Sequence, residues 1–299
     1  MRDALDRQGL LAALGCFVLW GLFPLLFDAM GALGATPFEI VGWRTVFAIP
    51  CAGLLVFVVG RGAGLASLLR APAQLALLAL SAGLIAVNWT VYIAAVTSGA
   101  TLSASLGYFI NPLVNLAIGA IFFRERISPT GRIGVALAAA GVLVQALALH
   151  ALPFVPLVLA FSFGGYGAVR KFDRADAQTG LFVECVFLLI PALILLAVLG
   201  SRGALHFGHG AAVSLLLVLA GPATVLPLAA FAFAARRLPL SMIGALQYLS
   251  PTLQFLCGLA LGERLRPATV LAFSLIWAGV VVFSVGAVQD ARRGAHKQA

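Results

Sequence analysis

The sequence predicts an all-α membrane protein whose ten transmembrane helices form two inverted five-helix repeats. Three observations predict this fold: the composition, a succession of ten apolar runs, and a polar, proline-containing segment that occurs once in each half. The chain of 299 residues is 62% hydrophobic and 10% charged, with a mean hydropathy of +1.09. A soluble domain carries roughly 25% charged residues, so this chain lacks the polar surface that a water-soluble globule needs.

Ten apolar runs approach the ~20 residues that cross a bilayer as a helix. No cleavable signal is expected, because the first run is itself long enough to span. The connecting loops are very short, so we expect consecutive helices to pack as antiparallel neighbours, with no separate soluble domain. The spans are expected at residues 9–28, 39–60, 73–97, 102–123, 130–149, 153–170, 179–199, 212–234, 240–261 and 268–288.

The basic residues predict the orientation, because cytoplasmic loops carry an excess of Lys and Arg. With the N-terminus inside, 15 of the 19 Lys and Arg face the cytoplasm, whereas Arg202, Arg264 and Arg266 face the other side and Arg44 lies within a span. Both termini are therefore expected in the cytoplasm. The net charge of +9 does not indicate nucleic-acid binding, since the basic residues form no basic aromatic patch.

No motif for chemistry is present. The four cysteines lie in apolar runs without a CxxC pair, and no histidine lies within an expected span. There is no HExxH, no GxSxG and no glycine-rich phosphate loop. We therefore expect buried structural cysteines, no enzymatic activity, no metal and no cofactor.

The polar segment Leu102–Arg126 returns as Leu240–Arg264. Matching the expected helix breaks, Pro112 and Pro251, requires a one-residue slip relative to the segment ends. An odd number of spans in each half places the second half (151–299) upside down relative to the first (1–150). Broken helices in corresponding positions of two halves point to a transporter's binding site. The match pairs Tyr108 with Gln247, Asn111 with Ser250, and Asn115 with Gln254.

Four features resemble the RarD-type EamA transporters of the drug/metabolite transporter superfamily, over essentially the whole chain. The resemblance implies a ten-helix inverted-repeat fold in the bacterial cytoplasmic (inner) membrane. It also implies export of small metabolites, with amino acids and amphipathic drugs as the usual proposals. The features are SLGYFINPLVN at Ser105–Asn115, AFSFGGYGAVRK at Ala160–Lys171, QYLSPTLQFL at Gln247–Leu256, and the loops that contain Glu125 and Glu263.

Polar and aromatic residues within the spans are the candidate substrate contacts. Each has a structural alternative: membrane amides also join helices, and aromatics near span ends also form an interfacial belt. Proline at mid-span frees a backbone carbonyl, which favours a cavity over packing. The expected contacts are Trp20, Asn88, Tyr92, Tyr108, Asn111, Asn115, Tyr166, Gln247, Tyr248 and Ser250.

Two ionisable residues within the spans are candidates for proton or charge coupling. Arg44 either reaches the outer interface or pairs with a carboxylate, on Glu184 or on a substrate. Its spacing from Glu39 disfavours a direct pair. Glu184 is either interfacial or a proton site. The cluster Arg170, Lys171 and Arg174 is interpreted as a topology determinant.

These observations favour a secondary transporter that exports a small amphipathic metabolite, with amino acids first, by alternating access. Its partners would be the solute and the lipid bilayer; a monomer suffices, and a homodimer stays open. Proton-coupled and simple facilitated export are equally open. The alternatives are an efflux pump for chloramphenicol-like drugs and a non-transporting membrane scaffold.

Overall fold

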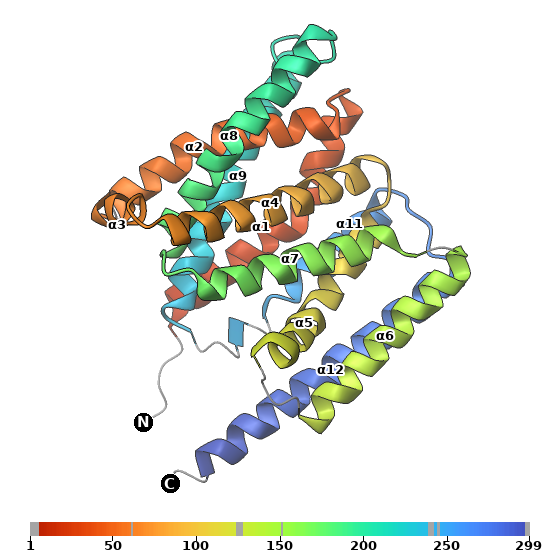
Figure 1. The fold of residues 1–299 in the computed structure, drawn as a ribbon. Coiled ribbons are helices and arrows are strands. Elements are labelled where there is room, and N and C mark those ends of the chain that lie inside the picture. The colour runs from red at the N-terminus through yellow and green to blue at the C-terminus, as the bar shows by residue number, and fades with distance from the viewer. Residues whose placement is uncertain are drawn as a thin grey trace.

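The computed structural model is helical throughout the residues it describes, which are 6–60, 62–123, 128–150, 152–238, 242–243 and 246–296 (Figure 1). The expected loop residues 124–127 and the start of the ninth span lie outside this set. The described helices are α1 (Arg7–Ala32), α2 (Pro37–Val58), α3 (Gly62–Leu68), α4 (Pro72–Thr97), α5 (Thr101–Phe123), α6 (Pro129–Leu149), α7 (Phe154–Phe172), α8 (Ala177–Ser201), α9 (Ala211–Ala235), α11 (Leu249–Ala260) and α12 (Pro267–His296).

Most helices begin and end close to the expected spans. Six of them, α1, α2, α4, α6, α8 and α9, are long and apolar enough to cross a membrane, and α11 and Pro267–Phe283 of α12 are shorter apolar helices. The short α3 was not expected. Helix starts follow local chemistry, since the side chains of Asp6, Thr36, Ser128 and Asp176 each accept a backbone N–H of the first turn.

The ninth span is not the continuous helix expected from residues 240–261. Helix α11 begins only at Leu249, and Gln247 and Tyr248 form a turn before it. Pro251 therefore lies in the first turn of α11, where its missing N–H costs no intrahelical bond. Pro112 is also not a helix end, because α5 continues through it.

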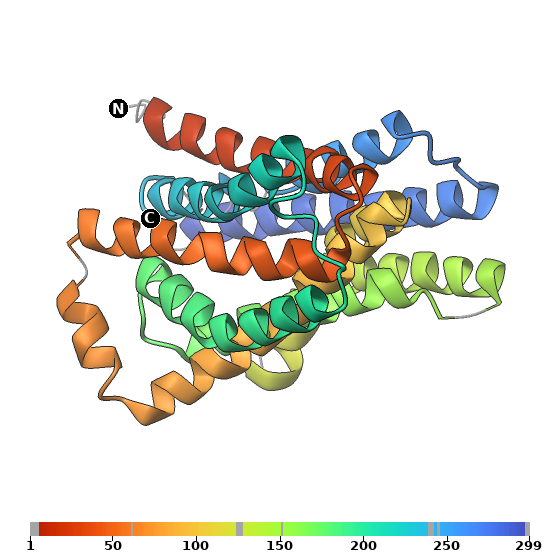
Figure 2. The ribbon, with the colours of Figure 1, turned by 90° about the horizontal axis from the view of Figure 1, so that it is seen from above.

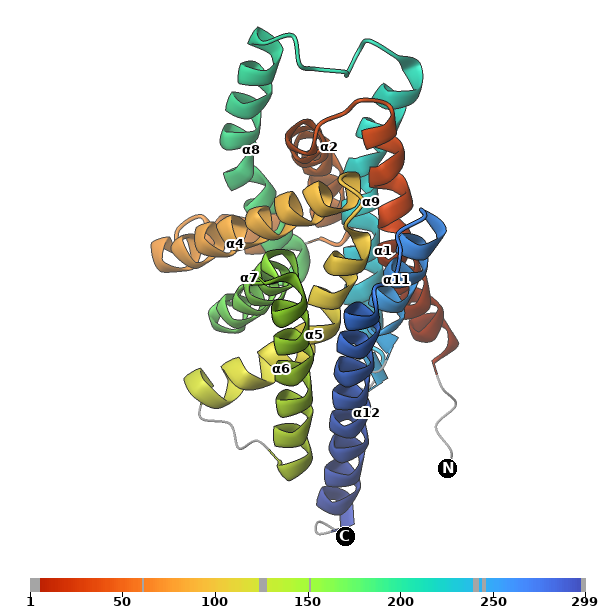
Figure 3. The same cartoon turned by 90° about the vertical axis from the view of Figure 1, so that its right-hand side faces the viewer.

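Consecutive helices are not the main packing neighbours, so the expectation from the short loops was wrong. The most extensive contacts join α6 to α12, α5 to α7, α2 to α8 and α9, α4 to α7, and α1 to α9 and α11. A short loop brings two helix ends together, but it does not make the helices lie along one another. Figure 3 shows α6 and α12 side by side, although more than 100 residues of sequence separate them.

The most extensive helix contacts are kept when each helix of one half is exchanged for its counterpart in the other. The counterparts are α1 and α7, α2 and α8, α4 and α9, α5 and α11, and α6 and α12. Under this exchange the α5–α7 contact becomes α11–α1, and α4–α7 becomes α9–α1. The α2–α9 contact likewise becomes α8–α4, whereas α6–α12, α2–α8 and α5–α11 map onto themselves.

The start of α1 and the end of α12 lie at the same end of the helix bundle, which we call the terminal end (Figure 2). At the opposite, far end, Phe27, Met30, Ile40 and Ile93 are packed into one fully buried cluster. Two carboxylates also join helices there. The Glu39 carboxylate accepts the backbone N–H groups of His206 and Phe207 at 2.7 and 3.0 Å.

The second far-end carboxylate belongs to Glu263, in the connection after α11. Its two oxygens accept the backbone N–H groups of Thr101 and Leu102 at 2.5 and 2.9 Å. These N–H groups are at the start of α5, where no intrahelical acceptor exists for them and the helix dipole favours a negative charge. Glu263 therefore caps a helix of the other half of the chain.

Replacing Gly221 by alanine is expected to destabilise the protein, because α9 touches the α2 backbone at this position. A Cβ atom on Gly221 would overlap the backbone carbonyl of Phe47, which cannot rotate away. Overpacking of this kind typically costs about 1–3 kcal/mol, more than the better helix propensity of alanine returns. Thermal unfolding in detergent should show a lower Tm.

The matched controls are Gly15→Ala and Gly83→Ala, since a Cβ atom at either position meets nothing within 4 Å. Both variants should unfold at the wild-type temperature or slightly above it. An unchanged Tm for Gly221→Ala would contradict the close approach of α2 and α9.

Candidate functional site

A cavity of about 350 Å³ lies between the two halves of the chain. Its described lining comes from α1, α2, α4 and α5 of the first half, and from α7, α8, α9 and α11 with the preceding turn in the second. Among the described residues, α6 and α12 contribute nothing to the wall, in keeping with their position at the side of the bundle (Figure 1). The cavity is thus built from corresponding helices of both halves.

The structure brings nearly all of the expected contacts together around this cavity. Asn115 is the exception: its side chain is exposed and lies against α7, where a Cβ atom on Gly164 would be 3.2 Å from Asn115 Oδ1. Its repeat counterpart Gln254 does line the cavity, so the two halves differ here. The expected residues on the wall are Trp20, Asn88, Tyr92, Tyr108, Asn111, Tyr166, Gln247, Tyr248 and Ser250, with Pro112, Pro251, Arg44 and Glu184.

Aromatic rings cover much of the wall. Tyr108 contacts Tyr92 and Phe163 edge to face, with ring centroids 5.5 and 6.1 Å apart. The Phe163 ring in turn contacts the Tyr166 ring, with centroids 5.9 Å apart. A second pair of lining rings, Trp20 and Phe231, has centroids 6.1 Å apart. Such rings present a large apolar surface with hydrogen-bonding edges, which suits an amphipathic solute.

Asn88 has all of its main hydrogen-bonding groups occupied within the protein. Its Nδ2 donates to the Leu159 carbonyl at 3.1 Å and to Ser162 Oγ at 3.0 Å, and its Oδ1 accepts from Tyr108 OH at 2.8 Å. Asn88 therefore has the structural role given above as the alternative to substrate contact: its amide joins α4 to α7. It also orients the Tyr108 ring on the cavity wall.

Four buried polar atoms on lining residues have no hydrogen-bond partner among the described residues. They are Tyr92 OH, Asn111 Oδ1, Tyr248 OH and Gln254 Oε1. An unpaired buried polar atom costs about 1–3 kcal/mol, and four on one wall are more than packing alone explains. Atoms of a bound solute or of water would satisfy them.

Arg44 does not reach the outer interface, and it does not pair with Glu184. Only 4% of the residue is exposed, and it lines the cavity. Its Nε donates to Thr224 Oγ1 at 2.6 Å, and its guanidinium carbon lies 4.1 Å from the centre of the Trp89 ring. As the spacing predicted, Glu39 does not bind it, because that carboxylate contacts His206 at 2.9 Å.

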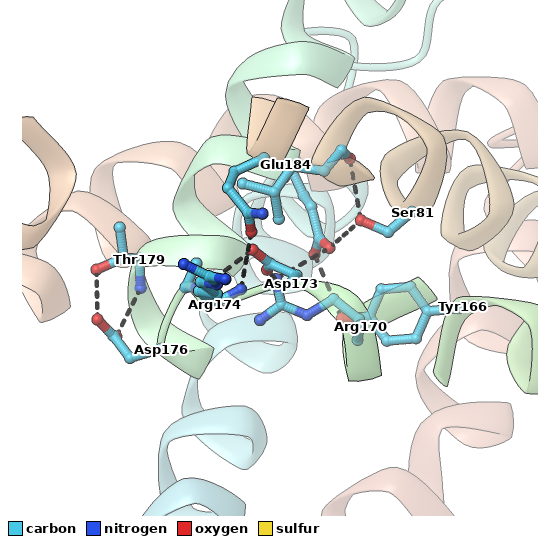
Figure 4. A network of polar contacts seen from close by, with 11 residues as sticks. Ser81, Tyr166, Arg170, Asp173, Arg174, Asp176, Thr179 and Glu184 are labelled. Carbon is cyan, nitrogen blue, oxygen red and sulfur yellow. Dashed lines mark hydrogen bonds and ion pairs between the residues drawn. The ribbon is translucent and has the colours of Figure 1, made fainter. Parts of the chain in front are cut away.

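Glu184 is not interfacial but buried, with 2% of the residue exposed, and it is the centre of a polar network (Figure 4). Ser81 Oγ donates to Glu184 Oε1 at 2.5 Å, and Tyr166 OH donates to Oε2 at 3.3 Å. Arg170 Nη1 lies 3.8 Å from Oε1 and also pairs with Asp173. Arg170 also lines the cavity, which goes beyond the topological role that the sequence suggested.

Several lining residues were not predicted as contacts. Gln254 could have been found from its pairing with Asn115 across the repeat, and Trp89 from its position beside Asn88. The contribution of Thr224 had no sequence signal, because α9 shows no polar stripe. Phe23, Phe163 and Phe231 are on the wall only because of how their helices cross.

Comparisons with known proteins cover nearly the whole chain. Residues 7–147 match the model of the EamA-like transporter family. The chain is 40% identical to "Protein RarD" of Streptomyces exfoliatus, covering 96% of this chain and 91% of that one. It is 39% identical to "Protein RarD" of Escherichia coli K12, over 96% and 97%. A solved crystal structure with 22% identity superposes with a TM-score of 0.59, over 93% and 97%, and so shares the fold.

Proposed function

We propose that this chain, which belongs to the EamA-like transporter family, exports small amphipathic metabolites, with amino acids first, across the bacterial cytoplasmic membrane. As a member of that family it is a multi-pass membrane transporter and not an enzyme, which sets the scaffold alternative aside. The main support for this class of substrate is the cavity between the two halves of the chain. Its wall combines aromatic surface with unpaired hydroxyl and amide atoms, which suits a solute with both apolar and polar parts.

The proposed architecture has ten membrane-spanning helices in two inverted repeats, residues 1–150 and 151–299. The packing pattern supports it, because the most extensive contacts between helices have counterparts after exchange of the halves. The family model also coincides with the first of the two proposed repeats. Two copies of one fold in opposite orientations can open to either side of the membrane, which is the basis of alternating access.

The distribution of polar contacts supports an inward-facing state. The cavity lining extends to Leu55, Arg170 and Gln178, which lie toward the terminal end of α2, α7 and α8. The far end is closed by the buried cluster and by Glu39 and Glu263. The excess of Lys and Arg at the terminal end supports a cytoplasmic position for that end.

A drug efflux pump is the second candidate, favoured by the aromatic share of the wall. A drug such as chloramphenicol would depend on the rings more than on the amides. The two candidates therefore differ in whether removing an amide oxygen abolishes transport.

Replacing Asn111 by leucine is expected to reduce amino-acid transport about tenfold or more, because a buried acceptor on the wall is lost. Ser250→Ala should act in the same direction with a smaller effect. Purified protein in liposomes would be loaded with one unlabelled neutral amino acid at a time, and uptake of a labelled trace would be measured. Chloramphenicol would be tested in parallel.

Asn115→Leu is the matched control, since it makes the same change on the same helix outside the cavity. It should exchange at the wild-type rate. Exchange of chloramphenicol without exchange of any amino acid would move the function to drug efflux. Unchanged transport by folded Asn111→Leu and Ser250→Ala proteins would overturn the site.

A further inference from the structure

Arg44 is a buried cation on the cavity wall whose charge the described part of the protein does not neutralise. Among the described residues, no Asp or Glu lies within 4.0 Å of its guanidinium. The buried carboxylates are engaged elsewhere, Glu39 with His206 and Glu184 with Ser81 and Arg170. The other cation on the wall, Arg170, pairs with Asp173 and Glu184. A charge in the membrane interior is costly unless it is paired.

The hydrogen bonds that the described residues make with the Arg44 guanidinium leave donors available. The guanidinium carbon lies over the Trp89 ring at 4.1 Å and over the Phe27 ring at 5.6 Å from the ring centroids, within cation–π range. Its N–H groups point outward in its own plane. Nε donates to Thr224 Oγ1, and neither Nη donates to any of the described residues. The edge formed by the two Nη atoms can therefore receive an acceptor.

An independent observation comes from Tyr92. Its hydroxyl is buried with no hydrogen-bond partner in the described part of the chain, and the residue is 3% exposed on the same cavity wall. Its ring packs edge to face on Phe27 at 6.0 Å, and Phe27 is also within cation–π range of Arg44. Tyr92 OH and the Arg44 Nη atoms are thus donors without a described acceptor, on two residues that both contact Phe27 and line the same cavity.

We propose that Arg44 is the anchor for an anionic carboxylate group of the transported solute, with Tyr92 OH as a second donor. The proposal rests on the proposed function and specifies its substrate class. A carboxylate matches the planar fork of a guanidinium and can accept two parallel N–H bonds from it. The bound anion would also neutralise the charge that the protein leaves uncompensated.

The test compares acids with uncharged analogues by ligand-induced thermal stabilisation of the purified protein. The probes are the neutral amino acids, their amides, and the matching carboxylic acids that lack the amine. Carboxylates should bind about 10–100-fold more tightly than the corresponding amides, because charge-assisted hydrogen bonds are lost with the charge. Arg44→Gln should abolish this preference, and Arg44→Lys should weaken carboxylate binding about tenfold by losing the fork.

Arg132→Gln, an exposed change on α6, is the control and should keep wild-type affinities. Thr224→Val keeps the cation but removes its Nε acceptor, so it covers the case in which Arg44→Gln does not fold. That variant should bind carboxylates several-fold more weakly and retain the preference for them. The proposal is overturned by equal binding of acids and amides, by an unaltered preference in both Arg44 variants, or by a panel in which no carboxylate stabilises the protein.

The exchange assay in loaded liposomes, described above, distinguishes a failure of the anion site from a failure of the proposed function. Transport of uncharged solutes without any preference for carboxylates would retain the transporter and overturn the anion site. Carboxylate binding that needs Arg44, without exchange of any amino acid, would retain the anion site and contradict the proposed substrate transport.

Discussion

Glu184→Gln is expected to reduce uptake driven by a pH gradient about tenfold or more, while exchange at equal pH continues. Glu184 is buried beside the cavity, and its carboxylate contacts Ser81, Tyr166 and Arg170. A buried carboxylate needs either a counter-charge or a proton. Arg170 can serve as the counter-charge, but it is shared with Asp173. In the proposed alternating-access movement, withdrawal of Arg170 from Glu184 would leave the carboxylate to a proton.

Glutamine has nearly the shape of the protonated side chain but cannot release a proton. The variant should therefore resemble one protonation state at every pH, and its exchange rate should not vary with pH. The measurement is uptake into proteoliposomes with and without an imposed pH gradient. Asp28→Asn is the control, because this α1 carboxylate does not line the cavity, and it should behave as wild type.

The opposite result is equally informative about coupling. Wild-type uptake that ignores a pH gradient would establish facilitated export and leave Glu184 with a structural role. A Glu184→Gln protein that still responds to the gradient like wild type would remove Glu184 from coupling.

Glu263→Gln is expected to open the far end of the molecule. The carboxylate accepts two backbone N–H groups at the start of α5, so the substitution loses the charge and one of two acceptors. Each hydrogen bond to a charged group contributes about 1.5–3 kcal/mol. A loss of that size shifts a two-state equilibrium about 10- to 100-fold.

Labelling of a buried far-end position reports the shift. Ala104 is fully buried in the far-end cluster. In a background without the four native cysteines, Ala104→Cys should react with an impermeant maleimide much faster when Glu263 is glutamine. Arg266→Gln, an exposed change in the same connection, is the control and should leave the labelling rate unchanged. Equal rates in both variants would show that Glu263 does not hold the far end closed.

The candidate site was predictable as far as the repeat could be seen in the sequence. Asn111 and Ser250 were found because a proline marks equivalent positions in two segments, and both line the cavity. Asn115 was predicted from the helical stripe of α5, but that part of the stripe is exposed beside α7 and lies outside the cavity. A stripe shows which residues share a face, and only the packing decides what that face meets.

The amino-acid sequence by itself determined the membrane class, the all-helical fold and the approximate bounds of most helices. These properties are local, since apolar length and N-terminal capping residues act within one segment. The tertiary structure decided which helices pack together, because crossing angles depend on side-chain contacts between segments distant in the chain. It alone placed Arg44 against Thr224 and Trp89, and Glu184 against Ser81 and Arg170. Whether a buried charge is paired or left without a counter-charge depends on such neighbours, and these come from helices far apart in the sequence.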